Sequence, residues 1–195
     1  MQNPAILLII CEGKETEPQY FEIVKRHRRI NNGVARVKII GDCGQHKKLI
    51  DLADSHRNEV CRKEDVELEE VEVWGVFDED NINVTFSELE KYSAARNVNL
   101  AFSSPMFELF LLQHFKRSAT NATGRELESL LSQEMNNKVG SNYNKNDLSV
   151  LKSAFDSEPA LLEGAIANCT QIENSSNSPF TSVHHLLQRL LDLAP

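Results

Sequence analysis

The sequence predicts an α/β fold with a mostly parallel sheet flanked by helices, followed by a helical C-terminal part. Up to residue 107, short apolar runs alternate with segments of helical periodicity, which is the pattern of parallel strands joined by crossover helices. After Phe107 the apolar residues recur at helical spacing, and no further strand of comparable strength follows.

The first strand and helix are expected in the N-terminal segment. Residues 5–11 form a continuous apolar run, typical of a strand that is buried on both faces. Thr16 can cap the following helix, and Pro18 stands just inside it. The helical spacing of apolar residues then continues up to the basic cluster at 25–29.

Three more strands are expected at residues 34–40, 71–77 and 99–102. Helices are expected between them at 47–60 and 87–96. These five segments complete the α/β part of the chain.

The C-terminal part is expected to contain helices whose apolar residues form core-facing stripes. These helices centre on residues 107–115, 127–135, 162–169 and 182–193, with loops at 136–147 and 174–179. We therefore expect an α/β core over residues 1–116 and a helical region over 117–195, packed together as a single compact unit.

Composition narrows the class of protein. The chain has 195 residues and a formal net charge of -8, and its apolar runs are far shorter than the roughly 20 residues of a membrane-spanning helix. Its four cysteines lack the close pairwise spacing of a zinc site or a disulfide framework. We expect a cytoplasmic protein with no membrane partner and with reduced thiols.

Carboxylates follow two of the expected strands. Glu12 comes directly after the first strand, and Asp78 and Asp80 follow the third. If those strands are neighbours, the three side chains emerge at one edge, because parallel strands end on the same side and lie about 4.8 Å apart. Clustered carboxylates attract a hard divalent cation such as Mg²⁺ or Mn²⁺. The alternative is a solvated acidic turn with Glu12 on the surface.

Four sequence blocks carry a resemblance to a known family. They are residues 10–21 (ICEGKETEPQYF), 76–80 (VFDED), 103–109 (SSPMFEL) and 181–186 (TSVHHL). The Glu-Gly turn and the Asp-x-Asp motif resemble the TOPRIM signature of topoisomerases, bacterial primases and OLD-type nucleases. The four blocks together resemble the RloB family, and this resemblance implies a TOPRIM-like, Rossmann-like sheet.

The resemblance also implies a function. It matches Glu12 to a metal-associated acid or base and Asp78 and Asp80 to metal ligands, so it implies Mg²⁺-dependent cleavage of nucleic acid, DNA or RNA, with tRNA among the candidates. RloB proteins resemble components of anti-phage, abortive-infection systems that often sit beside an ABC-type ATPase. A nuclease toxin is the leading hypothesis, and a non-catalytic regulator of such an ATPase is the alternative.

A receiver-like signalling domain is a third class, but it fits poorly because receivers carry paired acids after the first strand. The apolar helices after Phe107 also leave room for a homo-oligomer or partner interface.

Four further residues are weaker candidates. Glu17 lies one helical turn past Glu12 and can face the metal or serve the positive end of the helix dipole. Glu108 stands in an apolar block and needs a partner, either a basic residue or a second metal. By the resemblance, Lys145 matches a position that neutralises phosphate charge. The alternative is that it is simply an exposed lysine in a loop. His184 is a proton carrier or a structural hydrogen-bonding residue.

Overall fold

The computed structural model describes residues 6–33, 35–79, 85–120, 122–173 and 179–195. Its centre is a five-stranded sheet of order β2-β1-β3-β4-β5, in which the first four strands are parallel and β5 is antiparallel to β4. The strands are β1 (Ile6–Cys11), β2 (Arg36–Ile40), β3 (Val71–Asp78), β4 (Asn99–Ser104) and β5 (Phe180–Thr181). The predicted α/β class and the mostly parallel sheet are confirmed, and β1 and β3 are neighbours.

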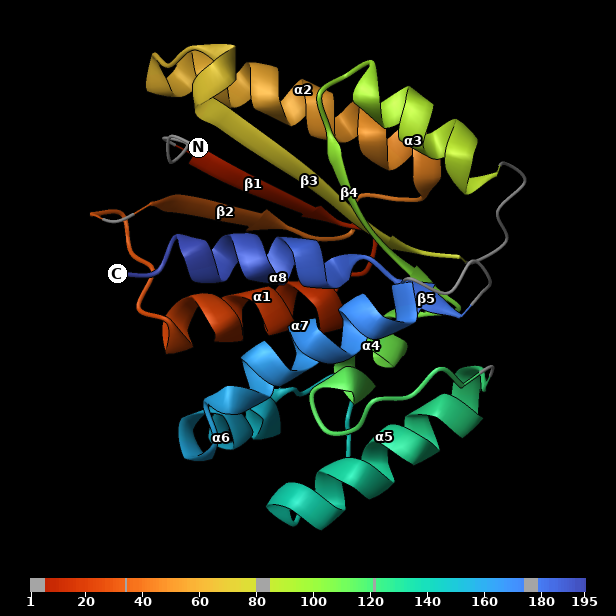
Figure 1. Ribbon diagram of the computed structural model, residues 1–195. Coiled ribbons are helices and arrows are strands. Elements are labelled where there is room, and N and C mark those ends of the chain that lie inside the picture. The colour runs from red at the N-terminus through yellow and green to blue at the C-terminus, as the bar shows by residue number, and fades with distance from the viewer. Residues whose placement is uncertain (1–5, 34, 80–84, 121, 174–178) are drawn as a thin grey trace.

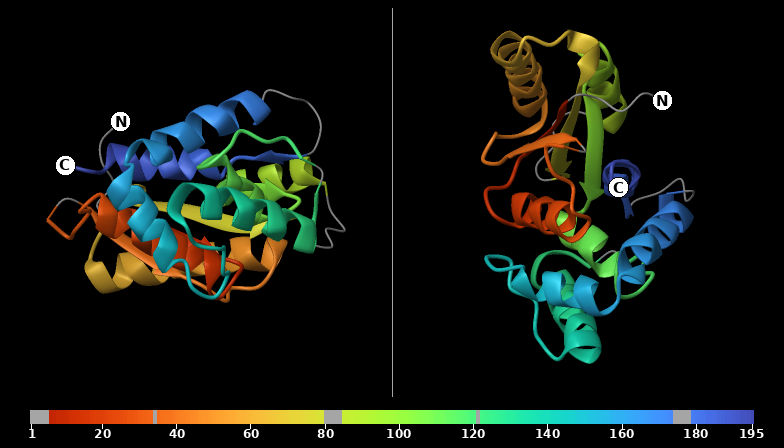
Figure 2. Two further views of the ribbon diagram at one scale, coloured as in Figure 1. Left: turned by 90° about the horizontal axis from the view of Figure 1, so that it is seen from below. Right: turned by 90° about the vertical axis from the view of Figure 1, so that its left-hand side faces the viewer.

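Helices cover both faces of this sheet (Figure 1). One face carries α2 (His46–Glu64) and α3 (Phe86–Ala94), and the other carries α1 (Thr16–His27) and α8 (Val183–Asp192). Beyond α1 lie the four remaining α-helices of the described residues, which form a further layer in the side view of Figure 2. They are α4 (Phe107–Gln113), α5 (Gly124–Val139), α6 (Ser149–Ser157) and α7 (Ala160–Glu173). A short 3₁₀ helix, η1 (Leu68–Glu70), precedes β3.

The first strand shows why the sheet needs cover on both sides. All six of its residues are buried, and successive side chains of a strand point to opposite faces. Leu7, Ile9 and Cys11 join the large core formed with α1 and the C-terminal helices. The alternate residues Ile6, Leu8 and Ile10 join a second core beneath α2 and α3.

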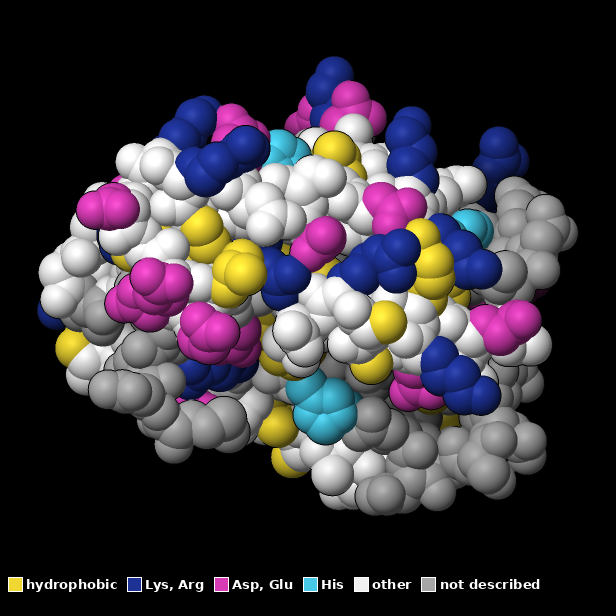
Figure 3. Space-filling view, turned by 90° about the horizontal axis from the view of Figure 1, so that it is seen from above, with side chains coloured by type: hydrophobic (Ala, Val, Ile, Leu, Met, Phe, Trp, Pro, Cys, Tyr) yellow, Lys and Arg dark blue, Asp and Glu magenta, His cyan; other side chains and the backbone are white. Residues whose placement is uncertain are grey.

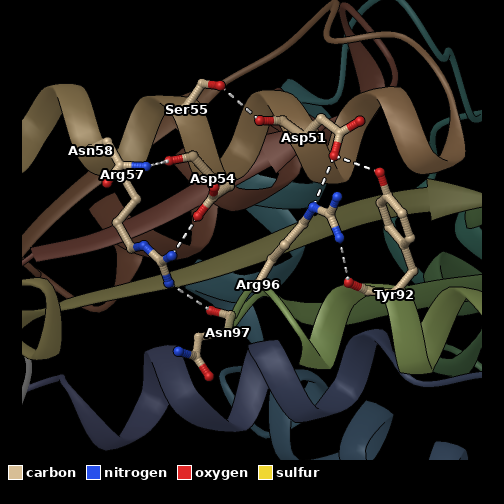
Figure 4. Close-up of polar contacts among 8 residues, drawn as sticks. All are labelled: Asp51, Asp54, Ser55, Arg57, Asn58, Tyr92, Arg96 and Asn97. Carbon is tan, nitrogen blue, oxygen red and sulfur yellow. Dashed lines mark hydrogen bonds and ion pairs between the residues drawn. The ribbon is translucent and has the colours of Figure 1, made fainter.

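Polar contacts hold α3 and the turn after it against α2 (Figure 4). The hydroxyl of Tyr92 and the guanidinium of Arg96 both contact Oδ1 of Asp51, at 2.8 and 2.9 Å. The guanidinium of Arg96 also lies 3.6 Å from the Tyr92 ring centroid. Basic and acidic side chains are interspersed over this face of the molecule (Figure 3), as is usual for a solvated helical layer.

Several predicted boundaries differ from the structure. The helix expected at 47–60 runs from His46 to Glu64, and residues 136–139, expected in a loop, form the last turn of α5. Thr16 is the first residue of α1 rather than its cap, which is Glu15, and its hydroxyl donates to the backbone oxygen of Lys145, 3.2 Å away. Part of the expected 174–179 loop lies outside the described residues.

Helix α6, strand β5 and the short 3₁₀ helix η1 were not predicted. Helix α6 follows the Asn-rich segment and buries Leu151, Ala154 and Phe155. Strand β5 has two residues, too few for a periodic signal, and it exists only because it pairs with β4. The Ser103 and Thr181 hydroxyls lie 3.0 Å apart across that pair. As a result the C-terminal segment, which was expected to be helical, joins the sheet through a strand much shorter than the four before it.

None of the described helices combines the length and the apolar character that a membrane crossing requires.

Candidate active site

The carboxyl ends of β1, β3 and β4 meet at one edge of the sheet, and acidic side chains gather there. The amide of Glu12 donates to the backbone oxygen of Val76 at 2.9 Å, which continues the β1–β3 ladder by one residue. The amide of Asp78 is 3.4 Å from Oε2 of Glu12. The first and third strands therefore bring Glu12 and Asp78 side by side, as their sequence positions predict.

Two further carboxylates belong to the same group. Glu17, on the first turn of α1, is 7% exposed, and Glu108, on the first turn of α4, is 5% exposed. The charges of Glu12, Glu17 and Glu108 all act on Asp78. We call these four residues the carboxylate cluster. Asp80, the remaining predicted ligand, lies outside the described residues.

Burial and mutual repulsion shape the protonation of this cluster. Burial, then the charge of Glu17, and after it those of Glu108 and Glu12, raise the pKa of Asp78 well above its usual value. Burial is also the main cause that raises the pKa of Glu17, and Glu108 and Glu12 add to it. A proton or a bound cation would therefore relieve the repulsion within this cluster.

A glycine makes room for Glu17. A Cβ placed on Gly13 would collide with the carboxylate of Glu17, so only glycine allows that carboxylate to pack where it does against the turn after β1. The backbone amides of Gly13 and Glu17 itself donate to the carboxylate and lower its pKa, which partly opposes the effect of burial. Glu17 thus lies both at the start of α1 and within the cluster, so the two interpretations of this residue are compatible.

The partner of Glu108 is a tyrosine, not a basic residue. The hydroxyl of Tyr143 donates to Oε1 of Glu108 at 2.7 Å. Burial raises the pKa of Glu108, and the Tyr143 hydrogen bond and the positive charge of Lys145 lower it. Burial, followed by the neighbouring Glu108 charge, raises the pKa of Tyr143. Sequence reasoning missed Tyr143, although an aromatic residue in an Asn-rich loop was a usable signal.

Lys145 approaches the cluster because its loop is tied to α1. Its backbone oxygen accepts from the Thr16 hydroxyl, and the next residue, Asn146, accepts from Nε2 of Gln19 at 3.1 Å. The amide of Leu148 donates to Oε1 of Gln19 at 3.1 Å. The loop that follows α5 in sequence is thereby held beside the start of α1.

His184 lies apart from these residues, on the first turn of α8. The residue is 2% exposed, its Nδ1 is 3.2 Å from the backbone oxygen of Thr181, and its ring lies tilted against that of His185 with ring centroids 4.1 Å apart. These contacts are those of a structural residue of the β5–α8 junction.

The chemistry of the cluster suits a hard divalent cation, because its donors are carboxylate oxygens and their mutual repulsion would be relieved by positive charge. In the part of the chain that the structure describes, however, no three His, Cys, Asp or Glu side chains converge closely enough to hold a metal ion. The donor type fits Mg²⁺ or Mn²⁺, and small side-chain rearrangements or Asp80 would have to complete the coordination.

Fold and site together define an α/β protein with buried carboxylates at the carboxyl edge of a parallel sheet, where such folds bind their ligands. A family model described as RloB-like protein matches residues 7–190, so the chain belongs to the RloB-like protein family. Neither a search of curated proteins nor a search of solved structures gave a match.

Proposed function

We propose that this protein is a Mg²⁺- or Mn²⁺-dependent phosphodiesterase that cleaves nucleic acid, with a TOPRIM-like site. One observation carries the proposal: the four carboxylates at the ligand edge of the sheet include Asp78 and Glu17, whose pKa values are both raised by burial and by the charges of neighbouring carboxylates. Retaining such repulsion costs stability, and active sites are where proteins commonly tolerate that cost. Membership of the RloB-like family supports the same direction.

In this proposal Glu12, Glu17, Asp78 and Asp80 hold the metal. A bound divalent ion would polarise the scissile phosphate and stabilise the charge that develops on its oxygens. Glu12, which is partly exposed at the end of β1, accepts the proton of the attacking water. Lys145 places a positive charge beside the phosphate, and buried Glu108 acts as a positioning residue through Tyr143 and Lys145.

The test is calorimetric titration of Mg²⁺ and of Mn²⁺ into the wild type and into the Asp78→Asn, Asp80→Asn double variant. We expect binding by the wild type alone, together with loss of nucleic-acid cleavage in the variant. Glu79→Gln is the matched control, since it lies between the two positions and its carboxylate contacts the Ser104 hydroxyl instead. Equal cleavage by the wild type and the double variant would exclude the metal mechanism.

A regulatory protein that works with an ABC-type ATPase is the second candidate, within the same anti-phage, abortive-infection setting. The observation in its favour is that Glu17 and Glu108 are both nearly closed off from solvent, and Tyr143 is hydrogen bonded to one of them. Protonated carboxyls in such a network need no metal. Under this alternative the double variant binds the ATPase and retains its effect on infected cells, which the nuclease proposal forbids.

A further inference from the structure

A cleft opens beside the carboxylate cluster, between the first turns of α5 and the loop that follows that helix. Its volume is about 430 Å³, which is in the range of small-ligand sites. Arg125 and Ser129 line it from α5, and Tyr143, Asn144 and Lys145 line it from the loop. The cleft therefore joins two cations with hydroxyl and amide groups.

The cleft adjoins the candidate active site through two of its residues. Tyr143 donates its hydroxyl to Glu108, and the charge of Lys145 acts on the same carboxylate. Glu108 in turn acts on Asp78. Glu108 therefore links the residues that line the cleft to the carboxylate at the end of β3.

The loop side of the cleft is built in advance of any ligand. The amide of Tyr143 donates to Oγ of Ser132 at 2.9 Å, which ties the loop to α5. Thr16 holds the backbone oxygen of Lys145 from α1. A ligand therefore does not have to order this segment, and pre-organisation of this kind favours binding.

The two cations of the cleft are not neutralised by ion pairs. Within the described residues, neither the Arg125 guanidinium nor the Lys145 ammonium makes an ion pair, and both side chains belong to exposed residues. Glu128 is the one acidic residue among the lining residues, and it opposes an anion. The chain as a whole carries a net charge of -8. Two cations without ion pairs beside four carboxylates are therefore better explained by a polyanionic ligand than by a contribution to solubility.

We propose that this cleft binds the phosphate backbone of a nucleic-acid strand, at phosphates next to the one that is cleaved at the carboxylate cluster. The inference rests on the proposed nuclease function and adds a substrate-binding subsite to it. Arg125 binds one phosphate through its planar guanidinium, Lys145 faces the phosphate nearer the carboxylates, and Asn144 and Ser129 donate hydrogen bonds to the strand. Contacts of this type read the backbone and not the bases.

The experiment measures binding of a short fluorescent single-stranded oligonucleotide, as DNA and as RNA, in the Asp78→Asn background, which keeps the strand intact. Adding Arg125→Ala should weaken binding about fivefold at 0.1 M salt and lower the salt slope by about 0.7, the value for one phosphate contact on a single strand. Adding Glu128→Gln should strengthen binding. Lys138→Ala is the control, because this lysine lies at the far end of α5 and pairs with Glu158.

The outcomes separate this subsite from the proposed function. An unchanged affinity and salt slope in the Arg125→Ala variant would overturn the subsite, while cleavage by the wild type would still support the nuclease. Binding that depends on Arg125, with no cleavage by the wild type, would keep the subsite and count against the nuclease. Full displacement of the oligonucleotide by inorganic phosphate at equal phosphate concentration would assign the cleft to a small anion and overturn the strand proposal.

Discussion

The hydroxyl of Tyr143 donates a 2.7 Å hydrogen bond to Oε1 of Glu108, and this contact links the loop after α5 to the carboxylate cluster. The two residues are 35 positions apart in sequence. Because Glu108 is 95% buried, the tyrosine supplies a hydrogen-bond donor that solvent cannot replace.

Removing that donor should destabilise the protein. For Tyr143→Phe we expect a loss of about 1–3 kcal/mol in the free energy of unfolding, since a buried acceptor is left without its partner. Chemical denaturation at neutral pH measures it. Tyr92→Phe is the control, because it deletes the same atom from an exposed contact with Asp51, and we expect a loss below about 1 kcal/mol there. If the two variants lose the same free energy of unfolding, burial of the Glu108 contact does not make its hydrogen bond more stabilising.

Neutralising one member of the cluster should stabilise the metal-free protein. The pKa of Asp78 is raised in the folded state. Ionisation of this group therefore costs stability once the pH rises above about 4, which is the pKa of an aspartate in the unfolded chain. In EDTA at neutral pH, we expect Asp78→Asn to increase the free energy of unfolding by roughly 1 kcal/mol or more. Thermal unfolding followed by circular dichroism is the measurement.

The control for this effect is Asp42→Asn, which makes the same chemical change at an exposed residue after β2. Its expected change is within about 0.5 kcal/mol. Destabilisation by Asp78→Asn in EDTA would mean that Asp78 contributes hydrogen bonds worth more than the repulsion it causes.

Gly13 and Glu17 should be energetically coupled. In Gly13→Ala the new methyl group meets the Glu17 carboxylate, and we expect a loss of about 1–3 kcal/mol from this overpacking. In a Glu17→Ala background the same substitution should cost less than half as much, because the obstructing atoms are gone. A double-mutant cycle by urea denaturation measures the coupling.

Gly164→Ala serves as the comparison for that cycle. Nothing lies within 4 Å of a Cβ at Gly164, which is inside α7, so alanine there should stabilise the protein by up to about 1 kcal/mol. Additive effects of Gly13→Ala and Glu17→Ala would disprove the proposed contact.

His114 should make the protein acid-sensitive. Burial lowers the pKa of His114 to about 4, and the ring is 3% exposed, with Nε2 2.9 Å from the Tyr20 hydroxyl. In the unfolded chain its pKa is about 6.5. Because the folded pKa is depressed, the stability contribution of neutral His114 is complete above about pH 6.5 and is lost progressively as the pH falls toward 4.

At pH 5 the expected loss from His114 alone is about 2 kcal/mol relative to pH 7. Denaturation curves at the two pH values measure it, and His114→Gln should remove that part of the difference. If the variant does not fold, an NMR titration of the His114 ring in the wild type decides the matter directly. A midpoint near 6.5 would contradict the prediction.

Much of the fold was predictable because each strong signal was local. Residues 6–11 form one unbroken apolar run. A strand of this kind is stable only in a sheet that is covered on both faces. The weak elements escaped prediction for the same reason. Strand β5 consists of Phe180 and Thr181 and depends entirely on its pairing with β4, so the segment itself contains no pattern that indicates a strand.

The candidate site was predictable in part. Glu12 and Asp78 follow apolar strands directly, and parallel strands must end at a common edge, so their proximity followed from sequence order once β1 and β3 were neighbours. Tyr143 and Arg125 could not be placed in this way. They belong to the helical layer, and their positions depend on how α5 and its loop dock against α1.

Local pattern therefore decided which segments form the four parallel strands and which acidic residues follow the first and third of them, because periodicity and burial act over a few residues of chain. The tertiary structure alone decided that Glu108 is bonded to Tyr143, and that a cationic cleft therefore adjoins the carboxylates. Contacts between residues 35 or more positions apart depend on helix docking, and the free energy of docking is summed over the whole core.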